Sequence, residues 1–184
     1  MPSPSKEEHV LKLLLENSPL KKWHFEEVVR EAQVTKAVAN KWLKKYVQDG
    51  VLARKKEKGK FPYFTVGSNN SVYYSLKRVY SLERLHKSGL IPKLLSLKTV
   101  KTIILFGSLA RGDWYKDSDI DLFIFGNLTD FDKNLYESKL KRNIELHVFR
   151  DKKEIQEVKT GLIKNVINGY LIKGDLQELV EMSS

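Results

Sequence analysis

The feature that most constrains this chain is a glycine–serine turn between an apolar run and two closely spaced aspartates. The run 103–106 (Ile-Ile-Leu-Phe) is followed directly by Gly107 and Ser108, and Asp119 and Asp121 open a second apolar stretch. Short apolar runs bounded by turn residues are typical of buried strands. Because side chains at positions i and i+2 of a strand point to the same face, the two carboxylates are predicted to lie side by side. The chain is therefore expected to bring two acidic groups to one end of a buried sheet.

Two carboxylates beside a turn with free backbone N–H groups favour a site for a divalent metal and a polyphosphate. Gly107 lets the backbone approach a phosphate closely, and Ser108 adds a hydroxyl and an N–H at the start of the next helix. A third carboxylate, Glu145, occupies a polar position of a predicted alternating strand, 143–149. If that strand neighbours 119–125, three carboxylates converge, and with a triphosphate they can hold two Mg²⁺ ions. The predicted metal ligands and catalytic residues are Asp119, Asp121 and Glu145.

The segment GSLARGDWYKDSDIDLFIF, residues 107–125, resembles the signature of the DNA polymerase beta-like nucleotidyltransferase superfamily: Gly-Ser, a spacer, then Asp-x-Asp. It is most similar to the minimal nucleotidyltransferases of archaea and bacteria, which include archaeal forms with an N-terminal winged helix. The resemblance covers residues 88–175 and implies that Asp119 and Asp121 bind metal. It also implies that Gly107 and Ser108 bind the triphosphate and that Arg111, at a common basic position, contacts phosphate. Glu145 is the candidate third carboxylate, where many relatives have Asp.

This resemblance implies an Mg²⁺-dependent enzyme that moves NMP from an NTP, expected to be ATP, to a hydroxyl and releases pyrophosphate. In related minimal enzymes the acceptor is often a protein, and some act as antitoxins on a helical toxin, so a helical toxin protein is an expected partner. An alternative is a DNA-binding transcriptional regulator whose nucleotidyltransferase-like domain only binds nucleotide or a partner. Transfer to a small molecule such as an antibiotic is a third reading. Retention of both aspartates favours the enzyme.

Residues 1–68 have the element order of a winged helix-turn-helix domain and carry 14 Lys/Arg against 8 Asp/Glu. Helices are expected at 5–16, 25–32 and 36–48, and a hairpin around Gly59 is expected to join extended runs at 51–56 and 61–66. A helix in the major groove and a basic wing over the phosphates would use charge in this way. The predicted DNA contacts are Lys36, Lys41, Lys44, Lys45, Arg54, Lys55, Lys56, Lys58 and Lys60. Winged helices also serve as protein–protein modules, and a specific DNA site would need a homodimer.

The predicted fold class is α+β: a winged helix-turn-helix at 1–68, a linker helix at 69–90, and a nucleotidyltransferase domain at 91–184. That last domain is expected to have a small mixed β-sheet with helices on one face. Its strands are predicted at 101–106, 119–125 and 143–149, with helices at 133–141, 153–166 and 175–182. His147 is interpreted as a surface or core partner and Trp114 as a loop anchor rather than a base-stacking residue.

Composition limits the remaining classes. The 184 residues are 41% apolar and 30% charged and include no cysteine, which excludes disulfides and thiolate metal sites. No apolar run approaches the roughly 20 residues that span a membrane, so a cytoplasmic protein is expected. The net charge of +10 indicates a polyanionic partner without choosing among nucleic acid, nucleotide and acidic protein.

Overall fold

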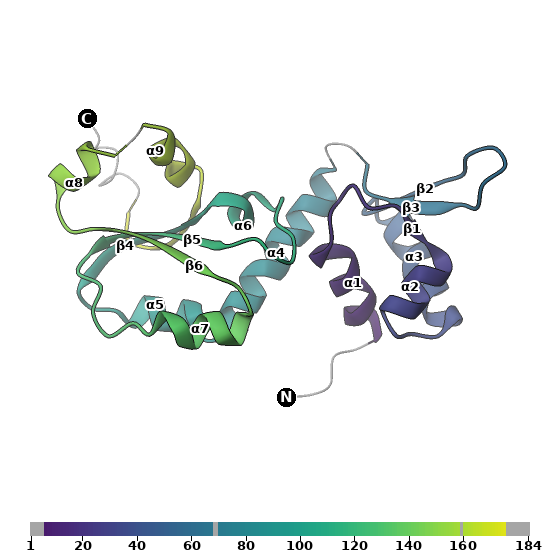
Figure 1. The fold of residues 1–184 in the computed structure, drawn as a ribbon, viewed down its shortest axis with the longest axis horizontal. Coiled ribbons are helices and arrows are strands. Elements are labelled where there is room, and N and C mark those ends of the chain that lie inside the picture. Colours follow the sequence, from purple (N-terminus) through teal and green to yellow (C-terminus); the bar gives the residue numbers. More distant parts are fainter. Residues whose placement is uncertain (1–5, 68–69, 159, 176–184) are drawn as a thin grey trace. The chain divides into compact units, whose positions relative to one another are not determined.

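The computed structural model describes residues 6–67, 70–158 and 160–175, and the chain divides into two compact units (Figure 1). The first unit contains the chain up to Lys77 together with Asp113–Lys116, and the second contains Arg78–Gly112 and the chain from Asp117 onward. This division differs from the boundaries expected at 68 and 90. The helix α4 (Ser71–Lys87) belongs to both units, because its first half places Tyr73 and Lys77 fully buried in the first unit.

The first unit combines helices with a small antiparallel sheet. Its helices are α1 (Lys6–Glu16), α2 (Phe25–Glu31) and α3 (Lys36–Gln48), and its strands are β1 (Trp23–His24), β2 (Ala53–Lys55) and β3 (Tyr63–Thr65), in the order β1-β3-β2. The three helices and the hairpin lie where the sequence predicts them, whereas β1 was not predicted. Thr35 caps α3, since its hydroxyl accepts a hydrogen bond from the Val38 N–H at 3.4 Å.

The second unit is built on a four-stranded mixed sheet in the order β6-β5-β4-β7. Its strands are β4 (Val100–Phe106), β5 (Ile120–Gly126), β6 (Ile144–Phe149) and β7 (Tyr170–Lys173). β4 is antiparallel to β5 and β7, and β5 is parallel to β6. The first three strands and the mixed sheet confirm the prediction. β7 was not predicted, because no strand was expected between the helices at 153–166 and 175–182. The second of these helices lies almost wholly outside the described residues.

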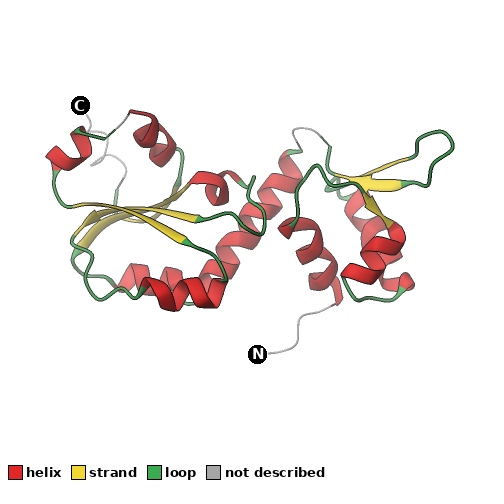
Figure 2. Ribbon diagram, viewed as in Figure 1, coloured by secondary structure: helices red, strands yellow, loops and turns green. Residues whose placement is uncertain are grey.

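Helices cover both faces of this sheet, so the expectation of helices on one face was wrong. Figure 2 shows α5 (Leu90–Ser96) and α7 (Lys133–Leu140) on one face, and α8 (Lys152–Gln156) and α9 (Thr160–Ile167) on the other. The cause is visible in β5, where Leu122 and Ile124 alternate with Phe123 and Phe125 and all four are buried. A strand that is apolar on both faces requires a packing layer on each side.

The α8–α9 layer has its own apolar core. Ile155 of α8 and Val166 of α9 pack with β-strand residues that are at most 5% exposed: Ile104, Phe106, Phe123 and Phe125. This face of the sheet also carries the site described below, because Phe123 lies two residues after Asp121 on β5. In the part of the chain that the structure describes, no helix combines the length and the apolar character needed to cross a membrane.

Candidate functional site

The glycine–serine turn lies where β4 passes into the short helix α6 (Gly107–Arg111). Gly107 has φ +71°, a conformation that side chains other than glycine adopt at a cost. A Cβ atom on Gly107 would lie 1.9 Å from Oδ2 and 2.8 Å from Cγ of Asp121. The Asp121 carboxylate therefore lies directly against the Gly107 backbone, in space that only glycine leaves open. The sequence-predicted turn and the sequence-predicted aspartate are thus brought together.

Asp121 and Glu145 are direct neighbours across the sheet. The parallel register pairs Asp121 of β5 with Glu145 of β6, and the antiparallel register places Asp121 opposite Phe106, the residue before Gly107. Of the three carboxylates expected to converge if the two strands were adjacent, Asp121 and Glu145 are brought together here. His147, two residues beyond Glu145 on the same strand, joins them: one ligand atom from each of Asp121, Glu145 and His147 lies within 4.8 Å of the others. Two carboxylates and an imidazole so close together are a donor set that a divalent cation can use.

Asp119 lies one residue before β5 and is exposed. It is not a member of the three-residue group formed by Asp121, Glu145 and His147 among the described residues. Its charge nevertheless acts on that group: burial raises the pKa of Asp121, and the carboxylates of Glu145 and Asp119 raise this pKa further. The same concentration of negative charge attracts a cation.

Two neighbouring side chains oppose this rise in the pKa of Asp121. His147 and Arg111 both lower the pKa of Asp121, so the predicted phosphate-contacting Arg111 lies within electrostatic reach of the carboxylates. Ser108 is half-buried on the first turn of α6, and Arg111 is exposed at its end. The structure thus gathers the turn, the acidic group and the basic residue in one region of the second unit.

Two residues near the motif were ambiguous in the sequence. Trp114 is 1% exposed, and its Nε1–H donates a hydrogen bond to the Lys77 carbonyl at 3.3 Å, which confirms its interpretation as a loop anchor. His147 was interpreted as a surface or core partner, and its place in the acidic group was missed. The signal that could have found it is its i+2 spacing from Glu145, which puts both side chains on one strand face.

The nine basic residues predicted to contact DNA are all exposed in the first unit. Three of them are engaged in ion pairs: Lys36 with Glu26 at 2.8 Å, Lys45 with Asp49 at 2.7 Å, and Lys60 with Glu57 at 2.6 Å. The remaining six have no acidic partner among the described residues: Lys41, Lys44, Arg54, Lys55, Lys56 and Lys58. These six cations carry the uncompensated charge of α3 and the β2–β3 hairpin.

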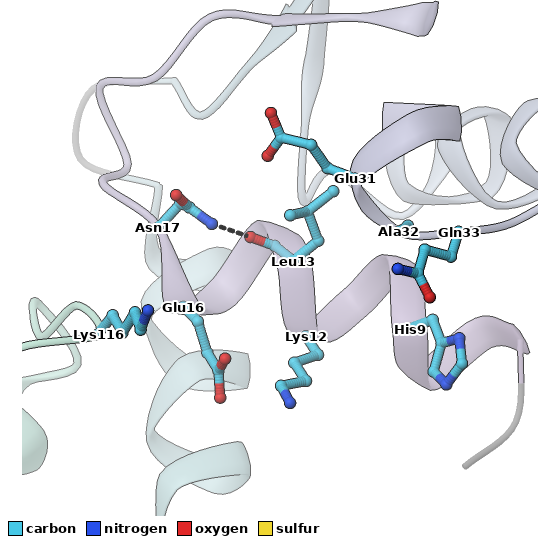
Figure 3. Close-up of a pocket in the computed structure, with 9 residues that line it drawn as sticks. All are labelled: His9, Lys12, Leu13, Glu16, Asn17, Glu31, Ala32, Gln33 and Lys116. Carbon is cyan, nitrogen blue, oxygen red and sulfur yellow. Dashed lines mark hydrogen bonds between the residues drawn. The ribbon is translucent and has the colours of Figure 1, made fainter. Parts of the chain in front are cut away.

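A separate hollow of ≈ 400 Å³ lies in the first unit (Figure 3). Its lining mixes cationic, anionic and amide side chains from α1, the α2 end and the 113–116 loop, among them Lys12, Glu16, Gln33 and Lys116. It contains none of the residues that the sequence predicts to bind metal, nucleotide or DNA. No candidate function was therefore assigned to it from the sequence.

A known protein family matches residues that lie mostly in the second unit. The sequence model of a family described as "Nucleotidyltransferase domain" matches residues 87–173, a range that holds every predicted metal and nucleotide ligand. A Methanocaldococcus jannaschii protein named "Putative protein adenylyltransferase MJ1379" is 34% identical over 108 residues, which are 58% of this chain and 96% of that protein. A second protein of that organism, "Putative protein adenylyltransferase MJ0604", is 61% identical over 33 residues, which are 18% of this chain and 32% of that protein.

A solved structure described as "Crystal structure of the toxin-antitoxin with AMP-PNP" is also similar to the chain. It is 18% identical, has a TM-score of 0.35, and covers 58% of this chain and 80% of its own. A solved toxin–antitoxin MntA–HpeT mutant matches with the same identity, coverage and TM-score.

Proposed function

Because the chain belongs to the nucleotidyltransferase-domain family, we propose that it moves AMP from ATP to a hydroxyl group of a protein, with the help of divalent metal. The observation that carries this proposal is the position of the Asp121 carboxylate, between the Gly107 backbone and its register partner Glu145. The choice of AMP is supported by the relative named an adenylyltransferase, of which the chain spans 96%.

The residues of the site suit a metal–triphosphate complex. Asp119, Asp121 and Glu145 are proposed to hold two Mg²⁺ ions, which when bound neutralise phosphate charge and lower the pKa of the acceptor hydroxyl. The donor set supports this, since two of these carboxylates already lie within 4.8 Å of each other. The backbone of the Gly107–Ser108 turn, the Ser108 hydroxyl and the Arg111 guanidinium are proposed to contact the phosphates.

In the proposed reaction the acceptor oxygen forms a bond to the α-phosphorus of ATP. The bond from that phosphorus to the oxygen bridging the β-phosphate breaks, pyrophosphate leaves, and the hydroxyl proton passes to solvent. We propose as acceptor a helical toxin protein, following the sequence resemblance to minimal nucleotidyltransferases that act as antitoxins. Positioning the acceptor within the site supplies most of the rate in such transfers, because little covalent chemistry is required of the protein.

A transfer assay tests this proposal. The full chain is incubated with α-labelled ATP, Mg²⁺ and candidate helical proteins, and label in protein and released pyrophosphate are measured. We expect transfer by the wild type and a loss of at least about 100-fold in Asp121→Asn and Glu145→Gln, since these carboxylates act on the reacting phosphate through the metal. Glu83→Gln, which removes an exposed acid paired with Lys87 in α4, is the matched control and should be unchanged. Absence of transfer and of pyrophosphate release with every NTP and partner contradicts the proposal.

We propose DNA binding as a second function, carried by the first unit. The order of its helices and strands and its β1-β3-β2 sheet suit a winged helix-turn-helix, which we propose this unit to be. In the hairpin, hydrogen bonds from Lys60, Lys22 and Tyr63 lower the pKa of Glu57 to about 2, so the one acid of this wing stays ionised and is neutralised locally. The other cations of the wing are then free to contact phosphate.

DNA binding can be tested by comparing lysines that form ion pairs with lysines that have no acidic partner among the described residues. Six unpaired cations bound to six phosphates would give a slope of log affinity against log salt near −5, at about −0.9 per contact. Lys56→Ala/Lys58→Ala should reduce the slope by about 2, whereas the matched pair Lys36→Ala/Lys45→Ala, whose lysines already have acidic partners, should reduce it less. The affinity for duplex DNA is measured by fluorescence anisotropy between 50 and 300 mM salt, roughly the range where this slope is measurable. The salt slopes of both double variants are compared with that of the wild type. A salt-independent affinity, or equal losses in the two variants, contradicts DNA binding by this surface.

The alternative function is that of a regulator that binds DNA and nucleotide but transfers no AMP. The same two assays distinguish this regulator from the proposed enzyme. It predicts normal DNA binding in the wild type with no pyrophosphate release under any condition. The enzyme reading predicts that Asp121→Asn abolishes transfer and leaves the salt slope of DNA binding unchanged.

A further inference from the structure

His147 is held in a defined orientation beside the acidic group. Its ring packs on the ring of Phe106 with centroids 5.2 Å apart, and its side chain is 25% exposed. The parallel register places it opposite Phe123, two residues along from the Asp121–Glu145 pair. A ring supported on one side by an aromatic neighbour keeps its nitrogen directed at the carboxylates, with Nε2 3.3 Å from Glu145 Oε1.

That distance is one that two ligands of the same metal ion adopt. Ligand atoms about 2.1 Å from a metal are about 3.0 Å apart at a right angle and about 3.4 Å apart at a tetrahedral angle. The 3.3 Å between His147 Nε2 and Glu145 Oε1 lies between these values. The ligand atoms of the whole group lie within 4.8 Å of one another, about 0.6 Å more than the roughly 4.2 Å between opposite ligands of one ion. Small side-chain rotations therefore close the set around one ion.

We propose that His147 is itself a metal ligand, and that Asp121, Glu145 and His147 form a mixed nitrogen–oxygen site that binds first-row transition ions such as Mn²⁺ more tightly than Mg²⁺. The inference rests on the proposed function, because it concerns the metal that this reaction would use. Imidazole nitrogen is a good ligand for transition ions and a poor one for Mg²⁺, which prefers oxygen and retains its water. The site thus differs from the all-carboxylate Mg²⁺ site expected from the sequence.

The direct test is spectroscopic and needs neither nucleotide nor acceptor. Mn²⁺ is added to the full chain, and pulsed electron paramagnetic resonance measures the modulation that a directly bound ¹⁴N imparts to the electron spin echo. We expect ¹⁴N modulation in the wild type. In His147→Asn the modulation should disappear and the Mn²⁺ dissociation constant should rise at least about tenfold, the lower end of what changes around a metal ligand cost. The ratio of the Mg²⁺ to the Mn²⁺ dissociation constant should fall by a similar factor.

The matched control is His86→Asn, which removes an exposed histidine of α4 in the same unit and should leave modulation and affinity unchanged. Wild-type protein that binds Mn²⁺ without ¹⁴N modulation, or His147→Asn that retains it, overturns the inference. If circular dichroism shows that His147→Asn does not fold, the pulsed electron paramagnetic resonance spectra of the wild type and of His147→Gln decide whether His147 binds the metal. Transfer of AMP is measured separately in Mg²⁺, so an active enzyme without ¹⁴N modulation refutes only the role of His147.

Discussion

Gly107→Ala tests the geometry on which the site depends, because the change adds a single methyl group at the turn. The new Cβ would lie 1.9 Å from Asp121 Oδ2, whereas real Cβ atoms essentially never approach closer than 3.0 Å. The carboxylate must therefore move by about 1.1 Å or more. A displacement of about 1 Å at reacting groups costs on the order of 100-fold in rate. We expect transfer activity to fall by that factor or more, and metal affinity to fall with it.

The same change also strains the backbone, and a control separates the two effects. Alanine at φ +71° costs roughly 1–2 kcal/mol relative to glycine, which lowers the melting temperature by several degrees. Gly89→Ala carries the same kind of strain at φ +85°, but its nearest neighbour, Tyr136 Cε1, is 4.0 Å away. Gly89→Ala should thus lose stability and keep activity.

The assay is transfer of labelled AMP together with a metal titration and a thermal melt for both variants. The reasoning predicts similar melting temperatures and a large difference in activity. It is refuted if Gly107→Ala matches Gly89→Ala in activity and metal affinity, since the contact between Gly107 and Asp121 would then have no part in placing the carboxylate.

Further predictions concern single groups. Because burial and the neighbouring carboxylates raise the pKa of Asp121, the ionised form destabilises the metal-free fold as pH rises through that pKa. Asp121→Asn should therefore melt higher than wild type at pH 7 in chelator and lose this advantage near pH 3; equal melting temperatures at pH 7 would contradict the linkage. Trp114→Ala removes a side chain that is 1% exposed and should cost about 3–5 kcal/mol in a denaturant titration, and a loss below about 1 kcal/mol would show that Trp114 does not anchor its loop. Chelation of divalent metal should abolish transfer while leaving the salt slope of DNA binding intact; transfer that persists in chelator would refute metal dependence.

The core of the site could be predicted from the sequence because it depends on local pattern. The strand before Gly107 and the strand containing Asp121 are short, strongly apolar and bounded by turn residues, and i, i+2 spacing assigns faces without knowledge of the fold. The position of Glu145 needed one further fact, that its strand is the parallel neighbour of β5. Residue spacing along the chain does not give the order of strands in a sheet, so the sequence predicted the approach of Glu145 to Asp121 only if their strands were neighbours.

The parts that sequence did not predict depend on tertiary contact. β7 is four residues long and pairs with β4 across a wide gap in the chain, so its strand character comes from its neighbour rather than from its own pattern. The α8–α9 layer covers Phe123 and Phe125, which lie on the strand face of Asp121; the alternation of residues along a strand does not say which helices cover that face. The i+2 spacing of His147 from Glu145 indicates a shared strand face, but only the parallel register with β5 places that face beside Asp121, so the place of His147 in the acidic group was missed.

The most direct test of the central claim is the mass of a candidate acceptor protein after incubation with the full chain, ATP and divalent metal. We expect wild-type protein to add one adenylyl group per modified hydroxyl, with pyrophosphate released in equal amount, and Asp121→Asn to add none. Modification that persists in Asp121→Asn at the wild-type rate would contradict the claim that the carboxylate held between Gly107 and Glu145 is the centre of the reaction.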